Sequence, residues 1–168
     1  MIGYMGIDPG ITGAIAILDE QGRYFDSLYL PVKKIEGKSR IDGSSIGEYV
    51  RHLKDKVHHI ILEKVWGFGG GQTSAFSFGK STGIIIGAVE SNTTKEIKEV
   101  APKTWQKALG FDPDQDPKEQ ALLYVQKHFP KVNLLKTSRS KVPHEGIVDA
   151  ICLSAYCYLT NWNSNKRS

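Results

Sequence analysis

Four acidic residues of this chain stand where secondary-structure elements are expected to begin or end. Asp8 interrupts the apolar stretch YMGIDPGITGAIAIL, Glu63 ends the run VHHIILE, and Glu145 and Asp149 lie four residues apart in PHEGIVDA. Burying an ionised carboxylate is costly unless a partner or a metal compensates the charge. Carboxylates gathered at one place would bind hard cations such as Mg²⁺ or Mn²⁺, and two such ions about 4 Å apart support phosphodiester hydrolysis.

Each carboxylate also has a simpler interpretation when taken alone. Asp8 begins an Asp-Pro-Gly sequence, which is a common turn. Glu145 would stand in the first turn of a helix, where the helix dipole stabilises negative charge. Glu145 and Asp149, however, share one helix face and repel each other there. The arrangement of all four is therefore what favours a metal site.

The elements that must position these residues follow from the hydrophobic pattern. Three short strands joined by turns predict an antiparallel meander over residues 1–8, 13–19 and 23–30. Apolar periodicity and capping signals then predict two further strands, at 57–65 and 94–101, a glycine-rich loop at 66–72, and helices at 43–56, 73–92, 102–109, 116–129 and 143–159. Strands reached through helical crossovers predict an α/β fold with a mixed five-stranded sheet flanked by helices. If the strands ending in Asp8 and Glu63 are neighbours, both carboxylates emerge at one edge.

Length and composition favour a single domain over residues 1–161, followed by a polar tail over 162–168. The chain has 22 Lys and Arg against 18 Asp and Glu, a net charge of +4, which is compatible with a polyanionic partner. Its two cysteines, Cys152 and Cys157, are poorly spaced for a disulfide within a helix, so we expect both to be reduced core residues. We expect no secretion signal and no membrane span.

Six segments together resemble the RuvC-type Holliday junction resolvases of the RNase H-like nuclease superfamily. They are GIDPGITGAIAIL, ILEKV, QTSAFSFGKSTG, VAPKTWQKALG, DPKEQALLYVQKHFP and HEGIVDAICLSAY, in this order across almost the whole chain. The final H-x-G-x-x-D-A pattern is most similar to the branch found in plant organelles and in some bacteria and phages. The resemblance implies an RNase H-like sheet and a crossover junction endodeoxyribonuclease. It also implies two Mg²⁺ ions per site, replaceable by Mn²⁺, and paired symmetric nicks that leave 5′-phosphate ends.

The same resemblance implies the roles of particular residues. It makes Asp8, Glu63 and Asp149 metal ligands. Relatives often carry an acidic residue or histidine three positions before the last aspartate, but here that position is Gly146. The fourth member of the site is therefore His144 or Glu145. Glu145 would be a further metal ligand, and His144 would bind metal, stabilise phosphate or donate a proton.

Several residues are candidates for DNA contacts. Aromatic side chains on a glycine-rich loop would stack on or wedge between unpaired bases, so the loop after Glu63 provides Trp66 and Phe68. Polar and basic residues near the expected site would contact the DNA backbone, and these are Lys64, Gln72, Thr73, Ser74, Lys80, Lys103, Lys107, Lys136, Arg139 and Lys141. For Gln72, Thr73 and Ser74 a role in capping the following helix is an equal alternative.

A four-way junction has approximate two-fold symmetry, so paired nicks require two sites and imply a homodimer. Residues 76–90 form the helix that we expect at its interface, because small glycines there permit close approach. We expect the protein in the cytoplasm of a bacterial or phage-infected cell, or in an organellar matrix.

Three other functions remain open at this point. The first is a broader RNase H-like nuclease acting on branched DNA or RNA–DNA hybrids. The second is a sugar-kinase or actin-like ATPase, because GIDPGITGA is also similar to a phosphate-binding loop, although one short domain lacks room for a second lobe. The third is a catalytically silent junction-binding module.

Overall fold

Seven strands and five helices are found in the part of the chain that the computed structural model describes, residues 3–64 and 71–165, with side chains to Asn161. The strands are β1 (Gly3–Asp8), β2 (Ala14–Leu18), β3 (Tyr24–Tyr29), β4 (Val32–Ile35), β5 (Lys38–Ile41), β6 (Val57–Glu63) and β7 (Ile97–Val100). The helices are α1 (Gly43–Leu53), α2 (Gly71–Glu90), α3 (Pro102–Ala108), α4 (Pro117–His128) and α5 (Glu145–Asn165).

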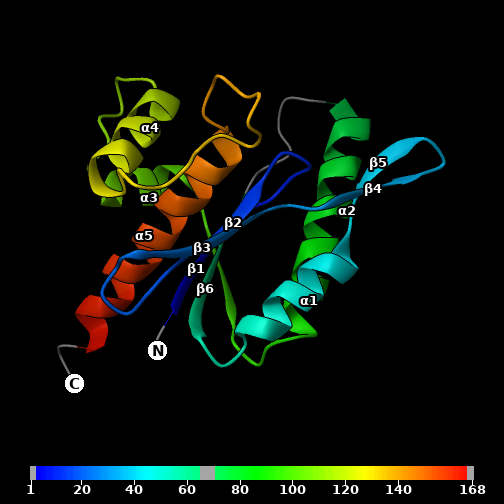
Figure 1. Cartoon of the computed structure of the whole chain (residues 1–168), viewed down its shortest axis with the longest axis horizontal. Coiled ribbons are helices and arrows are strands. Elements are labelled where there is room, and N and C mark those ends of the chain that lie inside the picture. Colours follow the sequence, from blue (N-terminus) through cyan, green and yellow to red (C-terminus); the bar gives the residue numbers. More distant parts are fainter. Residues whose placement is uncertain (1–2, 65–70, 166–168) are drawn as a thin grey trace.

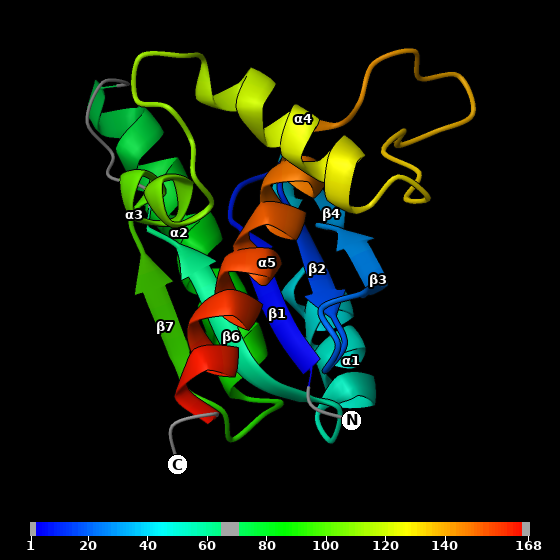
Figure 2. The same ribbon diagram turned by 90° about the vertical axis from the view of Figure 1, so that its left-hand side faces the viewer.

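The main sheet has five strands in the order β3-β2-β1-β6-β7. Strands β1, β2 and β3 pair antiparallel, whereas β6 is parallel to β1 and β7 is parallel to β6. Figure 1 and Figure 2 show α5 with α3 and α4 on one face of this sheet and α1 with α2 on the other. The predicted mixed five-stranded sheet flanked by helices is confirmed.

The alternation of side chains along β1 and β6 divides the core into two layers. Met5 and Ile7 of β1 pack with Ile60 and Leu62 of β6 in the layer under α1 and α2. Residues of the opposite parity, such as Ile61, pack in the layer under α5. Because successive side chains of a strand point to opposite faces, the residues after Ile7 and Leu62 belong to the α5 face. The strand period therefore assigns Asp8 and Glu63 to one side of the sheet.

The structure differs from the expected elements in two places. The hairpin β4–β5 was not anticipated, since all but one of its side chains are exposed and its pattern carries little burial signal. Its turn is set by Glu36 and Gly37, both with positive φ, which matches the twist of a two-residue hairpin.

Helix α5 continues to Asn165, beyond the expected end at residue 159. In this last stretch the Thr160 hydroxyl and the Asn161 side-chain amide donate hydrogen bonds to the carbonyls of Tyr156 and Cys157.

Both cysteines are buried and free, as predicted. Among the described residues, no helix combines the length and apolar character needed to cross a bilayer.

Candidate active site

Two neighbouring parallel strands carry the first two carboxylates of the site. Ile7 of β1 lies opposite Leu62 of β6, so Asp8 and Glu63 are the next residues on adjacent strands. Both side chains belong to the face that α5 covers, and both are partly exposed at the strand ends. The expectation that the two strands are neighbours is therefore correct.

Helix α5 brings Asp149 to this edge by an unusually close approach to the sheet. A Cβ atom built on Gly6 would collide with the Ala150 carbonyl and the Ser154 amide of α5. A Cβ built on Gly146 would collide with the Thr12 carbonyl in the turn between β1 and β2. Both contacts are to backbone atoms, so only glycine fits at either position. The departure at Gly146 from the pattern of the resolvases that the sequence resembles thus has a steric cause, and no acidic side chain can replace glycine there.

The charges of the four carboxylates act on one another. Burial raises the pKa of Asp8 to about 8, and the charges of Asp149, Glu63 and Glu145 add to the rise. Burial likewise raises the pKa of Asp149 to about 7, followed by the charges of Glu63 and Glu145. The pKa of Glu63 is also raised by burial. Elements far apart in the sequence therefore assemble one repulsive acidic cluster, Asp8, Glu63, Glu145 and Asp149, called the carboxylate cluster below.

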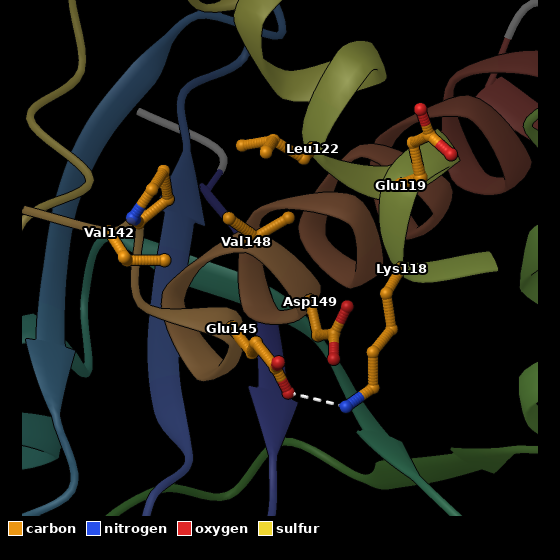
Figure 3. Close-up of a pocket in the computed structure, with 8 residues that line it drawn as sticks. Lys118, Glu119, Leu122, Val142, Glu145, Val148 and Asp149 are labelled. Carbon is orange, nitrogen blue, oxygen red and sulfur yellow. Dashed lines mark hydrogen bonds and ion pairs between the residues drawn. The ribbon is translucent and has the colours of Figure 1, made fainter. Parts of the chain in front are cut away.

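Glu145 and His144 differ sharply in their surroundings. The Lys118 ammonium of α4 donates a hydrogen bond to Glu145 Oε2 at 2.6 Å and forms an ion pair with it, and Figure 3 shows the Asp149 carboxyl beside this pair. His144 instead packs edge-to-face on Tyr29 with ring centroids 4.8 Å apart. Burial, then the charge of Lys136, lowers its pKa. The Nδ1 atom of His144 is buried and has no hydrogen-bond partner within residues 3–64 and 71–161. Glu145 thus interacts electrostatically with Asp8 and Asp149, whereas His144 lies against Tyr29.

A hollow of about 250 Å³ opens beside Asp149, between α4 and the start of α5 (Figure 3). It is lined by Lys118, Glu119, Leu122, Val142, Pro143, Glu145, Val148 and Asp149. Its wall is mainly apolar, and Lys118, Glu145 and Asp149 lie together at one side of it (Figure 3). A second hollow of about 370 Å³ adjoins it, and its lining includes Thr12, Lys136, Ser140 and His144.

The residues expected to contact DNA lie on three separate segments of the described chain, apart from Lys64. Gln72, Thr73, Ser74 and Lys80 are exposed in the first half of α2, Lys103 and Lys107 are exposed on α3, and Lys136, Arg139 and Lys141 are exposed in the segment before α5. Lys64 follows Glu63, and its backbone N–H donates to the Val100 carbonyl at 2.7 Å. Trp66 and Phe68 lie outside the described residues.

Two residues at the site were not anticipated from the sequence. Lys118 pairs with Glu145 across 27 positions of the chain, and no local pattern signals such a contact. The Trp105 indole N–H donates a hydrogen bond to Glu63 Oε1 at 2.8 Å. The predicted strand 94–101 offered one signal, since pairing it with the strand ending at Glu63 would bring the following helix over that carboxylate.

In the side-chain conformations present, no three His, Cys, Asp or Glu residues of the described chain are arranged to hold one metal ion. The donor set nevertheless fits a divalent cation in its chemistry, because carboxylate oxygens are the preferred ligands of Mg²⁺. The mutual repulsion within the carboxylate cluster is the kind that such a cation relieves.

No protein-family model matches this chain, and a search of curated proteins also finds no match. Solved structures do match. RuvC of T. thermophilus in complex with a Holliday junction substrate is similar with a TM-score of 0.63 and 14% sequence identity, over 98% of each chain. A further Thermus thermophilus RuvC structure is similar with a TM-score of 0.56 and 16% identity, over 96% of each chain. This chain therefore has the RNase H-like α/β fold seen in RuvC.

Proposed function

We propose that this protein is a divalent-metal-dependent endonuclease that resolves four-way DNA junctions by paired symmetric nicks. The carboxylate cluster carries the proposal. Three partly buried carboxylates, Asp8, Glu63 and Asp149, meet from β1, β6 and α5. Burial raises the pKa of all three, and the charges of neighbouring carboxylates raise those of Asp8 and Asp149 further. A fold gains no stability from such a cluster, which points to a functional role.

In this proposal Asp8, Glu63 and Asp149 hold the metal ions, with Glu145 as the fourth carboxylate. Bound Mg²⁺ or Mn²⁺ would supply an activated water and charge stabilisation at the cut phosphodiester. The residues of the chain have separate tasks. Lys118 holds Glu145 at the rim of the site, and the apolar wall beside Asp149 limits the access of bulk water to one side. Burial lowers the pKa of His144, which would favour its neutral imidazole, the form that binds a cation.

The DNA would reach the carboxylate cluster between two basic segments. Lys103 and Lys107 on α3 lie on one side, and Lys136, Arg139 and Lys141 lead into α5 on the other. Such contacts position the backbone without reading its sequence. The polar residues at the start of α2 and the aromatic pair Trp66 and Phe68 complete the proposed DNA contacts. The structural match to a RuvC solved with a Holliday junction supports this substrate.

A homodimer completes the proposal, with α2 as its interface. The N-terminal half of this helix is largely exposed, and Phe76 has 73% of its surface accessible. A Cβ built on Gly79, Gly83 or Gly87 would meet no described atom within 4 Å. These glycines recur every four residues, so they form one stripe on which a second α2 could pack closely. The protein would work where DNA recombines: a bacterial or phage-infected cytoplasm, or an organellar matrix.

The test is strand cleavage of a labelled synthetic four-way junction with Mg²⁺, Mn²⁺ or a chelator. Linear duplex, flap and RNA–DNA hybrid substrates are run beside it. Asp8→Asn removes a cluster charge, and Asp114→Asn is the matched control because Asp114 is an exposed loop residue. We expect symmetric metal-dependent nicks in the junction, lost in Asp8→Asn and kept in Asp114→Asn. Equal cutting of all substrates would indicate a general nuclease, and junction binding without cutting would indicate a silent binding module.

A further inference from the structure

The carboxylate of Glu63 accepts a hydrogen bond from Trp105 of helix α3, which follows the neighbouring strand β7 in the chain. Strand β7 pairs parallel with β6, and Glu63 lies opposite Val100 at the end of this ladder. Helix α3 begins at Pro102, two residues later, which places its fourth residue, Trp105, over the end of β6. The indole Nε1–H donates to Glu63 Oε1 at 2.8 Å.

The donor itself is fixed in place before any ligand binds. Trp105 is 2% exposed, and its ring packs edge-to-face on Phe111 with centroids 5.6 Å apart. Its backbone carbonyl accepts a hydrogen bond from the Leu109 N–H at 3.0 Å, which closes the last turn of α3. A side chain with only two rotatable bonds, buried on both ring faces, keeps its N–H in one direction.

Tryptophan is well suited to this position because its N–H is a donor without charge. A carboxylate has about four lone-pair sites, and the indole occupies one of them. The hydrogen bond therefore holds Oε1 of Glu63 in place and leaves the remaining sites for other partners. A lysine or arginine there would also bind Glu63, but its positive charge would oppose a cation binding to the same group.

We propose that Trp105 is a positioning residue that orients Glu63 for divalent-cation binding. The inference rests on the proposed metal-dependent function. It adds a residue that hydrogen-bonds the proposed metal ligand Glu63. Residues that hydrogen-bond a metal ligand from outside set the orientation of that ligand, and their loss typically weakens metal affinity or activity about 10- to 100-fold. Trp105 acts through Glu63 and contacts neither substrate nor metal itself.

The test compares two variants that disturb the same packing in different ways. Trp105→Phe keeps an aromatic ring against Phe111 but lacks the N–H donor. Phe111→Leu removes the ring contact and keeps the donor. Mn²⁺ binding is measured for wild type, both variants and Asp8→Asn by electron paramagnetic resonance of free Mn²⁺, with folding checked by circular dichroism. We expect Trp105→Phe to bind Mn²⁺ at least tenfold more weakly than wild type, and Phe111→Leu to bind within about twofold of wild type.

A measurement on the wild-type chain guards against a variant that does not fold. The Trp105 indole N–H resonance, assigned by its contacts to the Phe111 ring, should shift when Mg²⁺ is added and should stay in place in Asp8→Asn. Unchanged Mn²⁺ affinity in Trp105→Phe, or an equal loss in Phe111→Leu, overturns the positioning role while leaving the nuclease intact. Equal Mn²⁺ binding by wild type and Asp8→Asn overturns the metal site, and this inference with it.

Discussion

Gly146 of α5 lies against the Thr12 carbonyl so closely that no side chain fits between the helix and the turn after β1. This contact sets the height of α5 above the sheet and hence the position of Asp149 three residues later. Gly146→Ala should therefore lower the free energy of unfolding by about 1–3 kcal/mol, the usual cost of forcing extra volume into a packed region. Urea denaturation would measure it.

The control for this substitution is Gln126→Ala, at an exposed position inside α4. Alanine there should leave stability unchanged or raise it by up to about 1 kcal/mol, because alanine is the better helix former. If Gly146→Ala were as stable as wild type, α5 would have room to move away from the sheet, and its close approach would not define the site.

The raised pKa values of Asp8 and Asp149 predict that the metal-free protein loses stability as pH rises. An unfolded aspartate ionises near pH 4, whereas folded Asp8 and Asp149 retain protons up to about pH 8 and 7. Between those limits the folded state binds more protons than the unfolded state, so each group lowers stability by at most about 1.4 kcal/mol per pH unit. Below about pH 4 both aspartates are protonated in the folded and the unfolded state, so their full stabilising contribution to the free energy of unfolding is present there.

Denaturation midpoints measured with chelator from pH 5 to pH 9 would test this trend. Asp8→Asn removes one of the two groups, so its midpoint should fall less steeply and exceed that of wild type at pH 8. Added Mg²⁺ should restore the wild-type midpoint at pH 8 and have little effect on Asp8→Asn. A wild-type midpoint that rises over this range would contradict the proposed repulsion.

Substitutions of Glu145 and of His144 should differ in their effects on metal binding by the carboxylate cluster. The charge of Glu145 acts on both Asp8 and Asp149, so Glu145→Gln should weaken Mn²⁺ binding and cleavage by about tenfold or more. Its ion pair with Lys118 is exposed, and its loss should change stability by less than about 1 kcal/mol. His144→Gln should leave Mn²⁺ affinity nearly unchanged, and the reverse result would make the histidine the fourth ligand.

The exposed half of α2 predicts a dimer that a single polar substitution weakens. Phe76→Ser should raise the dissociation constant of the dimer at least tenfold, because a large apolar side chain at the centre of an interface contributes on the order of 2 kcal/mol. Leu123→Ser is the matched control, since Leu123 is 57% exposed on α4 at the other face of the sheet. Analytical ultracentrifugation over a dilution series distinguishes the two. Sedimentation of the wild-type chain as a monomer at micromolar concentration would contradict the proposed dimer through α2.

The sequence predicts residues that stand out within their own segment and misses those that do not. Asp8 and Glu63 stand out because each ends an apolar run, and the strand order then follows from short turns and crossovers. The hairpin β4–β5 buries little, so its apolar pattern is weak. Lys118 and Trp105 are ordinary in their own segments, and they gain meaning only from contacts 27 and 42 positions away. The steric need for Gly146 depends likewise on a carbonyl in another element.

The parallel pairing of β1 with β6 has a consequence for how the protein folds. Asp8, Glu63 and Asp149 reach one edge through contacts that span most of the chain, and folds built on such long-range pairing form slowly. During synthesis on the ribosome, one edge of β1 stays unpaired until β6 has been made. Asp149 is made with α5, the last of the described elements. The repulsive carboxylates therefore meet late, together with the apolar layer that α5 completes on its face of the sheet. A nascent chain remains without the complete site until its final helix has emerged.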